Sequence, residues 1–116
     1  MTDLASLISA VETTLAETEA EYAEMPFFVR PMVRRGFEKR TGRDLAAWRA
    51  LLADARRGQR VRELADGLAA LAEHFAGAPA RAKRGMGASG AQLAMLEQRA
   101  RVRGEAALAL RAALLA

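Results

Sequence analysis

The chain has no cysteine and no asparagine, only one histidine, and only 5% aromatic residues. Without cysteine it can form no disulfide or thiolate metal site, and it has no thiol nucleophile. A single histidine leaves almost no set of residues for nucleophilic catalysis or for a zinc site. No apolar run approaches the ~18 residues of a membrane span, and the first residues lack the basic region of a signal peptide. We therefore expect a non-enzymatic cytoplasmic protein without catalytic residues, cofactor, metal site or membrane span.

Alanine and leucine dominate the hydrophobic residues, which make up 52% of the 116-residue chain. These two residues favour helices, and the scarcity of β-branched and aromatic residues argues against a sheet. The length is that of one domain with a core of its own. We predict an all-α protein, a bundle of four or five helices forming a single domain over residues 1–116. The predicted helices span residues 3–25, 28–41, 44–57, 59–76 and 90–115.

Two of these helices are long and carry apolar residues at alternating spacings of three and four, which is the pattern of a packed helical seam. In the first helix the seam consists of Leu4, Ile8, Val11, Leu15, Thr18, Tyr22 and Met25. In the last helix it consists of Leu93, Leu96, Ala100, Arg103, Ala107, Leu110 and Leu114. We expect the two helices to pack together, within one chain or between two. Arg103 should then reach an acidic side chain near Thr14 or Thr18.

The charge is distributed unevenly along the chain. Residues 1–25 contain six acidic and no basic side chains, whereas the whole chain has a net charge of +4. The remainder is therefore strongly basic. Such a division indicates either an anionic partner or neutralisation of one part of the chain by the other.

The boundary between the acidic and basic parts is an aromatic and basic segment that runs from Pro26 to Arg40. Its phenylalanines and cations would lie on opposite sides of a helix that begins between Phe28 and Pro31 and ends before Gly42. On this pattern Phe28 or Val29 would join the buried side. We predict that the segment docks a protein partner. The predicted partner-binding residues are Phe27, Phe28, Arg30, Arg34, Arg35 and Lys39.

About residues 20–40 carry a family resemblance. The residues Glu24-Met25-Pro26-Phe27-Phe28-Val29-Arg30, followed by Met32-Val33-Arg34-Arg35 and Phe37-Glu38-Lys39, resemble the small helical C-terminal module of the light-independent protochlorophyllide reductase B subunit and its relatives. The resemblance implies a helical appendage close to a tetrapyrrole substrate and a partner subunit. Pro31 departs from the family pattern, and the chain lacks the cysteines that hold that family's iron–sulfur clusters. The resemblance thus supports a docking or accessory role.

A second basic stretch follows the fourth predicted helix. Glycines and Pro79 within residues 77–89 predict a flexible loop, which carries the candidate anion-binding residues Arg81, Lys83 and Arg84. The sequence Gly85-Met86-Gly87-Ala88-Ser89-Gly90 has the G-x-G-x-x-G form of a phosphate-binding turn. That motif requires a preceding strand, which the pattern does not supply, so we interpret it as a hinge before a helix capped by Ser89 and Gln92.

Two alternative functions remain open. Arg30–Arg43 and Arg81–Arg84 could bind nucleic-acid phosphates, although the segment lacks the polar residues that read bases. A tetrapyrrole-binding accessory role would need His74 as a ligand, but a histidine at a helix end is more often an exposed cation. We favour an interaction or assembly module that docks a protein partner and forms a homo-oligomer.

Overall fold

The computed structural model describes residues 3–87 and 89–116 of the chain, and these residues form six helices and no strand. The helices are α1 (Leu4–Ala23), α2 (Arg30–Thr41), α3 (Leu45–Arg56), α4 (Val61–Ala76), α5 (Ala78–Met86) and α6 (Gly90–Leu115). The predicted all-α fold with long first and last helices is confirmed, with one helix more than the sequence pattern indicated.

Short polar side chains and a glycine set several helix boundaries. The Asp3 carboxylate accepts a hydrogen bond from the Ser6 amide (2.7 Å), and the Asp44 carboxylate accepts one from the Ala47 amide (2.8 Å). Each bond pairs an amide that the first helical turn leaves without an intrahelical acceptor. Gly42 ends α2 with φ 83°, a left-handed conformation that glycine adopts without steric cost. Ser89 precedes α6, but its side chain makes no capping bond, so the predicted capping box is not formed.

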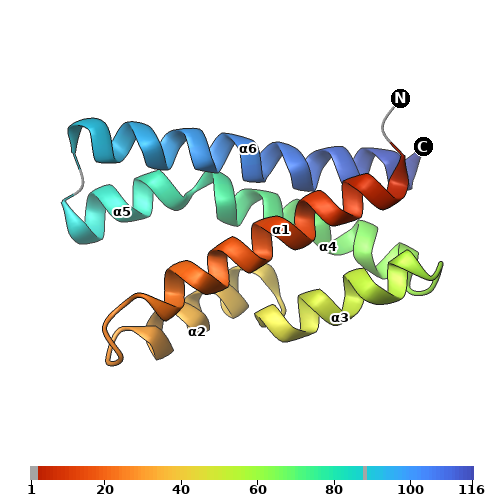
Figure 1. Ribbon diagram of the computed structural model, residues 1–116, viewed down its shortest axis with the longest axis horizontal. Helices are drawn as coiled ribbons and strands as arrows, with labels where there is room; N and C mark the ends of the chain where they lie inside the picture. The colour runs from red at the N-terminus through yellow and green to blue at the C-terminus, as the bar shows by residue number, and fades with distance from the viewer. Residues whose placement is uncertain (1–2, 88) are drawn as a thin grey trace.

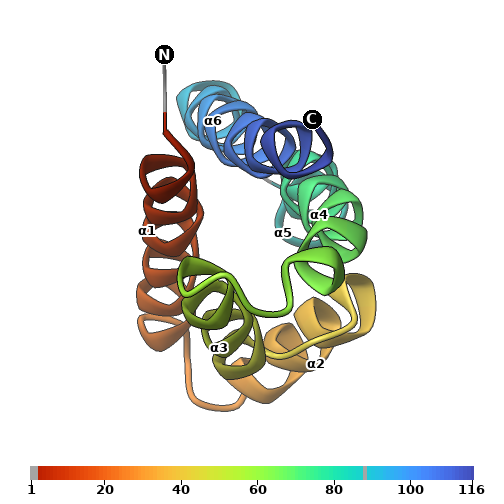
Figure 2. The same ribbon diagram turned by 90° about the vertical axis from the view of Figure 1, so that its right-hand side faces the viewer.

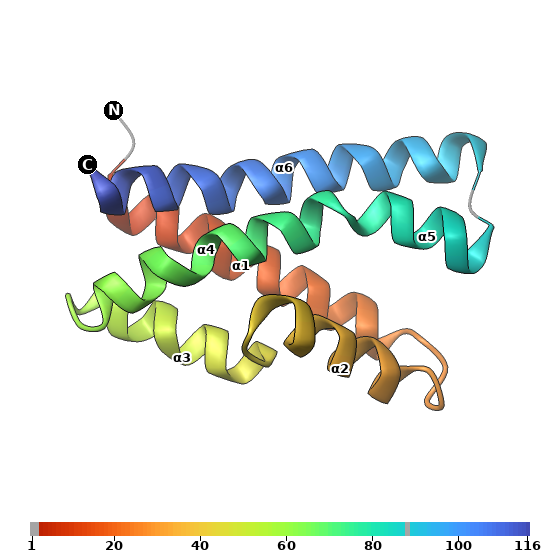
Figure 3. The ribbon, with the colours of Figure 1, turned by 180° about the vertical axis from the view of Figure 1, so that it is seen from behind.

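The helices surround one core, as the end-on view in Figure 2 shows. Helix α6 has 26 residues and therefore a length of about 39 Å, close to the 41 Å long dimension of the molecule. It lies along α4 and α5, while α1 crosses in front and α2 and α3 follow on the opposite side (Figure 1). The start of α1 and the end of α6 lie at one end of the molecule. The α1–α2 turn and the end of α5 lie at the other (Figures 1 and 3).

The core consists of aliphatic and aromatic side chains from α1, α2, α3, α4 and α6. Fully buried examples are Ile8, Leu15, Phe37, Trp48, Leu51, Leu64, Leu68, Leu71 and Leu110. Each such side chain contributes ~1.5–3 kcal/mol when it leaves water. The Trp48 indole N–H donates to the Thr41 hydroxyl (3.0 Å), so this large side chain is buried without an unpaired donor. Its ring lies against Gly67, where a Cβ atom would come within 3.0 Å of it.

The first and last helices do pack together, and Arg103 joins them as expected. Its guanidinium lies 2.5 Å from a Glu21 carboxylate oxygen and 3.4 Å from one of Glu17, the residue next to Thr18. The main neighbour of α6 is nevertheless α4, a pairing that the seams did not indicate. The two helices come close at Gly104, where a Cβ atom would lie 3.8 Å from the Ala72 carbonyl oxygen.

The prediction of a flexible loop over residues 77–89 is wrong for most of that segment, because residues 78–86 form α5. Pro79 lies in the first helical turn, where its fixed φ suits a helix and its missing N–H costs nothing. Gly87, with φ 64°, ends the helix. The hinge predicted from the glycine motif therefore shortens to the connection between α5 and α6. Ala88, which lies within it, is outside the described residues.

No helix in residues 3–87 and 89–116 has both the length and the apolar character needed to cross a membrane.

Candidate functional site

The turn between α1 and α2 holds two phenylalanines on the outside of the molecule. The Val29 amide donates to the Pro26 carbonyl oxygen (2.9 Å), and Arg30 Nε donates to the Met25 carbonyl oxygen (2.8 Å). These bonds fix a tight turn whose two central side chains point outward. Phe27 is 78% exposed and Phe28 is 71% exposed, and their rings meet edge to face with centroids 5.8 Å apart. The expectation that Phe28 or Val29 would join the buried side holds only for Val29, which is half-buried.

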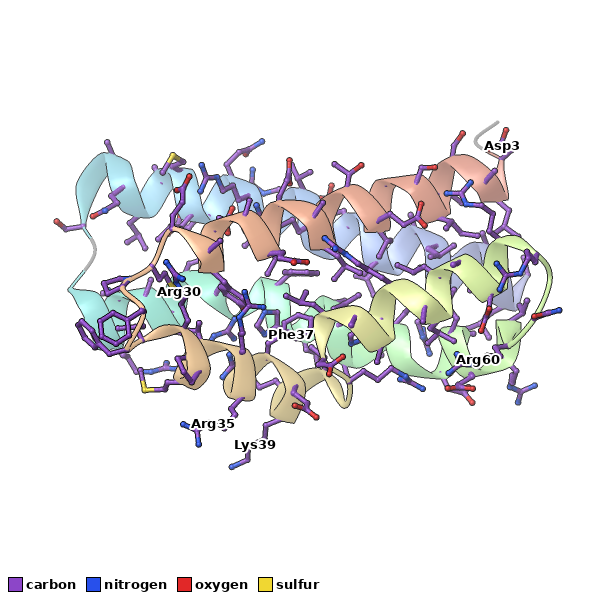
Figure 4. The ribbon with its side chains drawn as sticks, turned by 60° about the horizontal axis from the view of Figure 1, so that its bottom comes forward. Asp3, Arg30, Arg35, Phe37, Lys39 and Arg60 are labelled. Atoms are coloured by element: carbon purple, nitrogen blue, oxygen red, sulfur yellow. The ribbon has the colours of Figure 1, made fainter. Side chains whose placement is uncertain are left out.

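Helix α2 continues this surface on its outer side. Figure 4 shows Phe37 pointing into the bundle, while Arg35 and Lys39 point away from it. Arg34 lies over the Tyr22 ring at 6.0 Å from its centroid, a distance at which a guanidinium is attracted by an aromatic face. Met32 is exposed beside the turn and adds apolar area. All six predicted partner-binding residues thus lie at the turn and on α2. We call them the aromatic–basic surface.

Arg30 differs from the other members of this surface. Its side chain is half-buried and its Nε is bound to the Met25 carbonyl oxygen, so it holds the turn in shape. We therefore assign it a positioning role, whereas Phe27, Phe28, Arg35 and Lys39 are free to touch a partner.

The acidic residues of α1 are paired with cations of α3 and α6. Glu12 pairs with Arg56 (2.5 Å), Glu19 with Arg49 (2.8 Å), Glu21 with Arg99 (3.6 Å), and both Glu17 and Glu21 with Arg103. The hydrogen bonds that Arg103 donates to Glu21 raise the pKa of the Arg103 guanidinium further. The acidic first helix is therefore neutralised by α3 and α6, and not by the basic segment that directly follows it in sequence.

The cations of the aromatic–basic surface have no such partner. Among residues 3–87 and 89–116, no carboxylate lies within 4.0 Å of a charged nitrogen of Arg30, Arg34, Arg35 or Lys39. In the basic stretch from Arg30 to Arg43, Arg43 alone is paired within the described chain, with Glu63 at 2.9 Å. The hydrogen bonds that Glu63 accepts from Arg60 and from Arg43 lower its pKa to about 2.

The second predicted set, Arg81, Lys83 and Arg84, lies on α5 at the same end of the molecule as the α1–α2 turn (Figures 1 and 3). Lys83 and Arg84 are exposed. Arg81 is half-buried instead, because its Nη2 donates to the His74 carbonyl oxygen at the end of α4 (2.6 Å). The two basic stretches, separate in sequence, therefore form one cation-rich end.

The structure corrects the expectation that His74 is an exposed cation. The side chain is only 5% exposed, and it packs edge to face against Phe37 and Phe75. Its Nδ1 accepts a hydrogen bond from Arg40 Nε at 3.1 Å. Burial, assisted by the charges of Arg81 and Arg40, lowers the pKa of His74 to about 3, so the imidazole is neutral. The link to Arg40, which lies 34 residues earlier, has no signature in the sequence.

A groove of about 540 Å³ adjoins the aromatic–basic surface between α2 and α3. Its lining combines the cations of Arg34 and Arg35 with the carboxylates of Glu19, Glu38 and Asp44 and with apolar Phe37 and Leu45. In the described part of the chain, no three histidine, aspartate or glutamate side chains come together as a metal site would require. The surface presents exposed rings, guanidinium groups and this groove.

Comparison with protein-family models, with curated proteins and with solved structures gives no match to this chain. The resemblance of residues 20–40 to the protochlorophyllide reductase module therefore stays a prediction. So does a tetrapyrrole-binding role, for which the buried His74 offers no exposed ligand.

Proposed function

We propose that this protein is a non-enzymatic docking module whose aromatic–basic surface binds an acidic segment of another protein. One observation carries the proposal: Phe27 and Phe28 stand in solvent beside cations that have no carboxylate partner within the described chain. Exposed aromatic side chains next to arginine are the residues that dominate protein–protein binding energies. Adjacent exposed apolar side chains of this kind are typical of protein–protein interaction sites.

Charge complementarity identifies the chemistry of the partner. Guanidinium groups around an apolar centre fit a segment in which carboxylates flank apolar side chains, because the carboxylates can accept paired hydrogen bonds. A second copy of this chain is less suitable, since the carboxylates of its own α1 are held by α3 and α6. We therefore assign the surface to a different, acidic protein.

Selection of displayed random peptides on the native protein tests this proposal. Selected peptides should be rich in aspartate or glutamate next to apolar residues. Their binding should weaken roughly tenfold or more in the double variant Phe27→Ser/Phe28→Ser, because each lost aromatic contact is worth ~2 kcal/mol at a central position.

The matched control is Leu4→Ser, which removes an exposed apolar side chain from the start of α1, at the opposite end of the molecule from the turn (Figure 1). This variant should bind the selected peptides as the native protein does. Peptides without acidic residues, or peptides whose affinity ignores Phe27 and Phe28, would contradict the proposal.

A nucleic-acid-binding role is the second candidate, and the joining of the two basic stretches at one end of the molecule favours it. Exposed cations of α2 and α5 could contact successive phosphates there. A fluorescent duplex and a single strand titrated across a salt series separate the two functions. Binding that falls steeply with salt and is lost in Lys83→Gln/Arg84→Gln would support nucleic acid, whereas near-absent binding at low salt would remove it.

Self-association and a cytoplasmic setting are further parts of this proposal. The lack of cysteine supports a reducing compartment. Exposed apolar side chains along α6 offer area for a second copy; they are Met95, Val102, Leu108 and Leu115. Light scattering over a range of protein concentrations measures the mass directly, and a monomer at every concentration would contradict self-association.

A further inference from the structure

Two guanidinium groups from different helices converge on the buried His74. Arg40 Nε of α2 lies 3.1 Å from His74 Nδ1, and Arg81 Nη2 of α5 lies 3.3 Å from the same nitrogen. Arg81 Nη2 also donates to the His74 carbonyl oxygen. The acceptor that brings the two cations together is thus a neutral imidazole.

No anion compensates these two charges within the described chain. Neither Arg40 nor Arg81 has a carboxylate within 4.0 Å among residues 3–87 and 89–116. Burial and the neighbouring charge of Arg40 lower the pKa of Arg81, which shows that the positive charge there is poorly stabilised. A third cation, Arg34, lies over the ring of the adjacent Tyr22. Most other arginines of the described chain, by contrast, have a carboxylate partner.

We propose that Arg40 and Arg81 form a binding site for a phosphate group at the junction of α2, α4 and α5. A guanidinium carries several N–H donors in a planar fork that matches the oxygens of phosphate. His74 occupies Arg40 Nε and Arg81 Nη2, and no acceptor within the described chain takes Arg40 Nη1 and Nη2 or Arg81 Nε and Nη1. Arg40 is exposed and Arg81 is half-buried, so a phosphate group can reach both from solvent.

Two glycines make room for this arrangement. A Cβ atom at Gly36 would lie 3.0 Å from Arg40 Nη2, and one at Gly77 would lie 2.8 Å from Arg81 Nη1. Each guanidinium therefore occupies space beside a glycine that the side chain of any other residue would partly fill. Gly36 lies inside α2, where glycine costs ~1 kcal/mol relative to alanine unless it serves a local contact. Here Gly36 leaves room for the Arg40 guanidinium.

Calorimetric titration with inorganic phosphate, O-phosphoserine and acetate tests the site and its ligand. We expect saturable binding of inorganic phosphate or O-phosphoserine. The tighter of the two tells whether free phosphate or a phosphorylated side chain is the natural ligand. Arg40→Gln and Arg81→Gln should each weaken binding roughly tenfold or more, because each removes a charged hydrogen-bond donor. Arg111→Gln, which removes an exposed charge from α6 outside both proposed binding sites, should change affinity less than about twofold.

A second variant keeps the proposal testable if the arginine variants fold poorly. Gly36→Ala retains every charge and favours the helix, but its methyl group would lie 3.0 Å from Arg40 Nη2, so the guanidinium must shift by a few tenths of an ångström. It should weaken phosphate binding while the protein stays folded. The single imidazole gives a site-specific reading by NMR. Phosphate bound to Arg40 and Arg81 should shift the ring resonances of His74, whose Nδ1 both guanidinium groups contact.

Four results would overturn the site: no saturable binding, an equal loss in Arg111→Gln, acetate binding as tightly as phosphate, or ring resonances of His74 that stay unchanged at saturating phosphate.

Discussion

Charges along the length of α1 and charges at the end where α1 turns into α2 are used in opposite ways. Along α1 the carboxylates meet guanidinium groups of α3 and α6. At the turn and on α2 and α5 the cations meet no carboxylate within the described chain, and two of them converge on a neutral histidine. The first arrangement orients helices against one another. The second brings like charges together, and their repulsion costs free energy of folding. That cost supports the binding roles proposed above for these cations.

We expect the largest effect on stability from lowering the pH, because His74 at the cation-rich end then becomes protonated. Its pKa is near 6.5 in the unfolded chain and about 3 in the fold, so between these values the unfolded state binds more protons. Stability is then complete above about pH 6.5 and decreases as the pH falls toward 3. We expect a loss of about 2 kcal/mol between about pH 7.5 and about pH 5. Urea unfolding followed by Trp48 fluorescence measures it.

The variant His74→Gln serves as the control for this effect. It keeps an acceptor for Arg40 but cannot be protonated in this range, so its stability should change little between the same two pH values. The carboxylate of Glu63, whose pKa is lowered to about 2, stays ionised in the fold over this range. If the stability of the native protein changed as little with pH as that of the variant, burial and the two cations would not hold His74 neutral.

Removing Arg103 tests the paired region, where a smaller effect is expected. The Arg103 side chain is only 12% exposed, and it satisfies Glu21 and Glu17 together. Arg103→Met should destabilise the fold by about 1–2 kcal/mol, because the half-buried Glu21 loses both hydrogen bonds that Arg103 donates and keeps only the longer contact with Arg99. Denaturant unfolding gives the value. Arg62→Gln, at a highly exposed pair with Asp66, is the matched control and should cost less than about 0.5 kcal/mol.

Local sequence signals predicted most helix boundaries and failed where two rules conflicted. Asp3, Asp44 and Gly42 act at helix ends as their types suggest. The glycines and Pro79 of residues 77–89 suggested a loop, yet a proline in the first turn suits a helix and Gly87 ends it. The pairing of α6 with α4 could not be predicted because α6 carries apolar residues on every side, and its close approach depends on Gly104.

The candidate surface was predicted in composition but not in shape. The sequence indicated that aromatic and basic residues would share the segment around Phe27 and Arg34. Helical spacing is enough to put Phe37 on the buried face of α2, whereas the outward position of Phe27 depends on the hydrogen bonds of the turn. The contact of His74 with Arg40 and Arg81 arises from tertiary packing across α2, α4 and α5, which no spacing along the chain encodes.

The smallest expected effect on stability belongs to the exposed cations of α2. Arg35 and Lys39 stand one helical turn apart and point into solvent (Figure 4), so they repel each other and contact no carboxylate within the described chain. The double variant Arg35→Gln/Lys39→Gln should leave the free energy of unfolding within about 0.5 kcal/mol of the native value. It should still weaken binding of the acidic peptides and lower their association rate at low salt. A loss of stability as large as that of Arg103→Met would mean that these cations serve the fold. The distinction between a paired region for folding and an unpaired end for binding would then no longer hold.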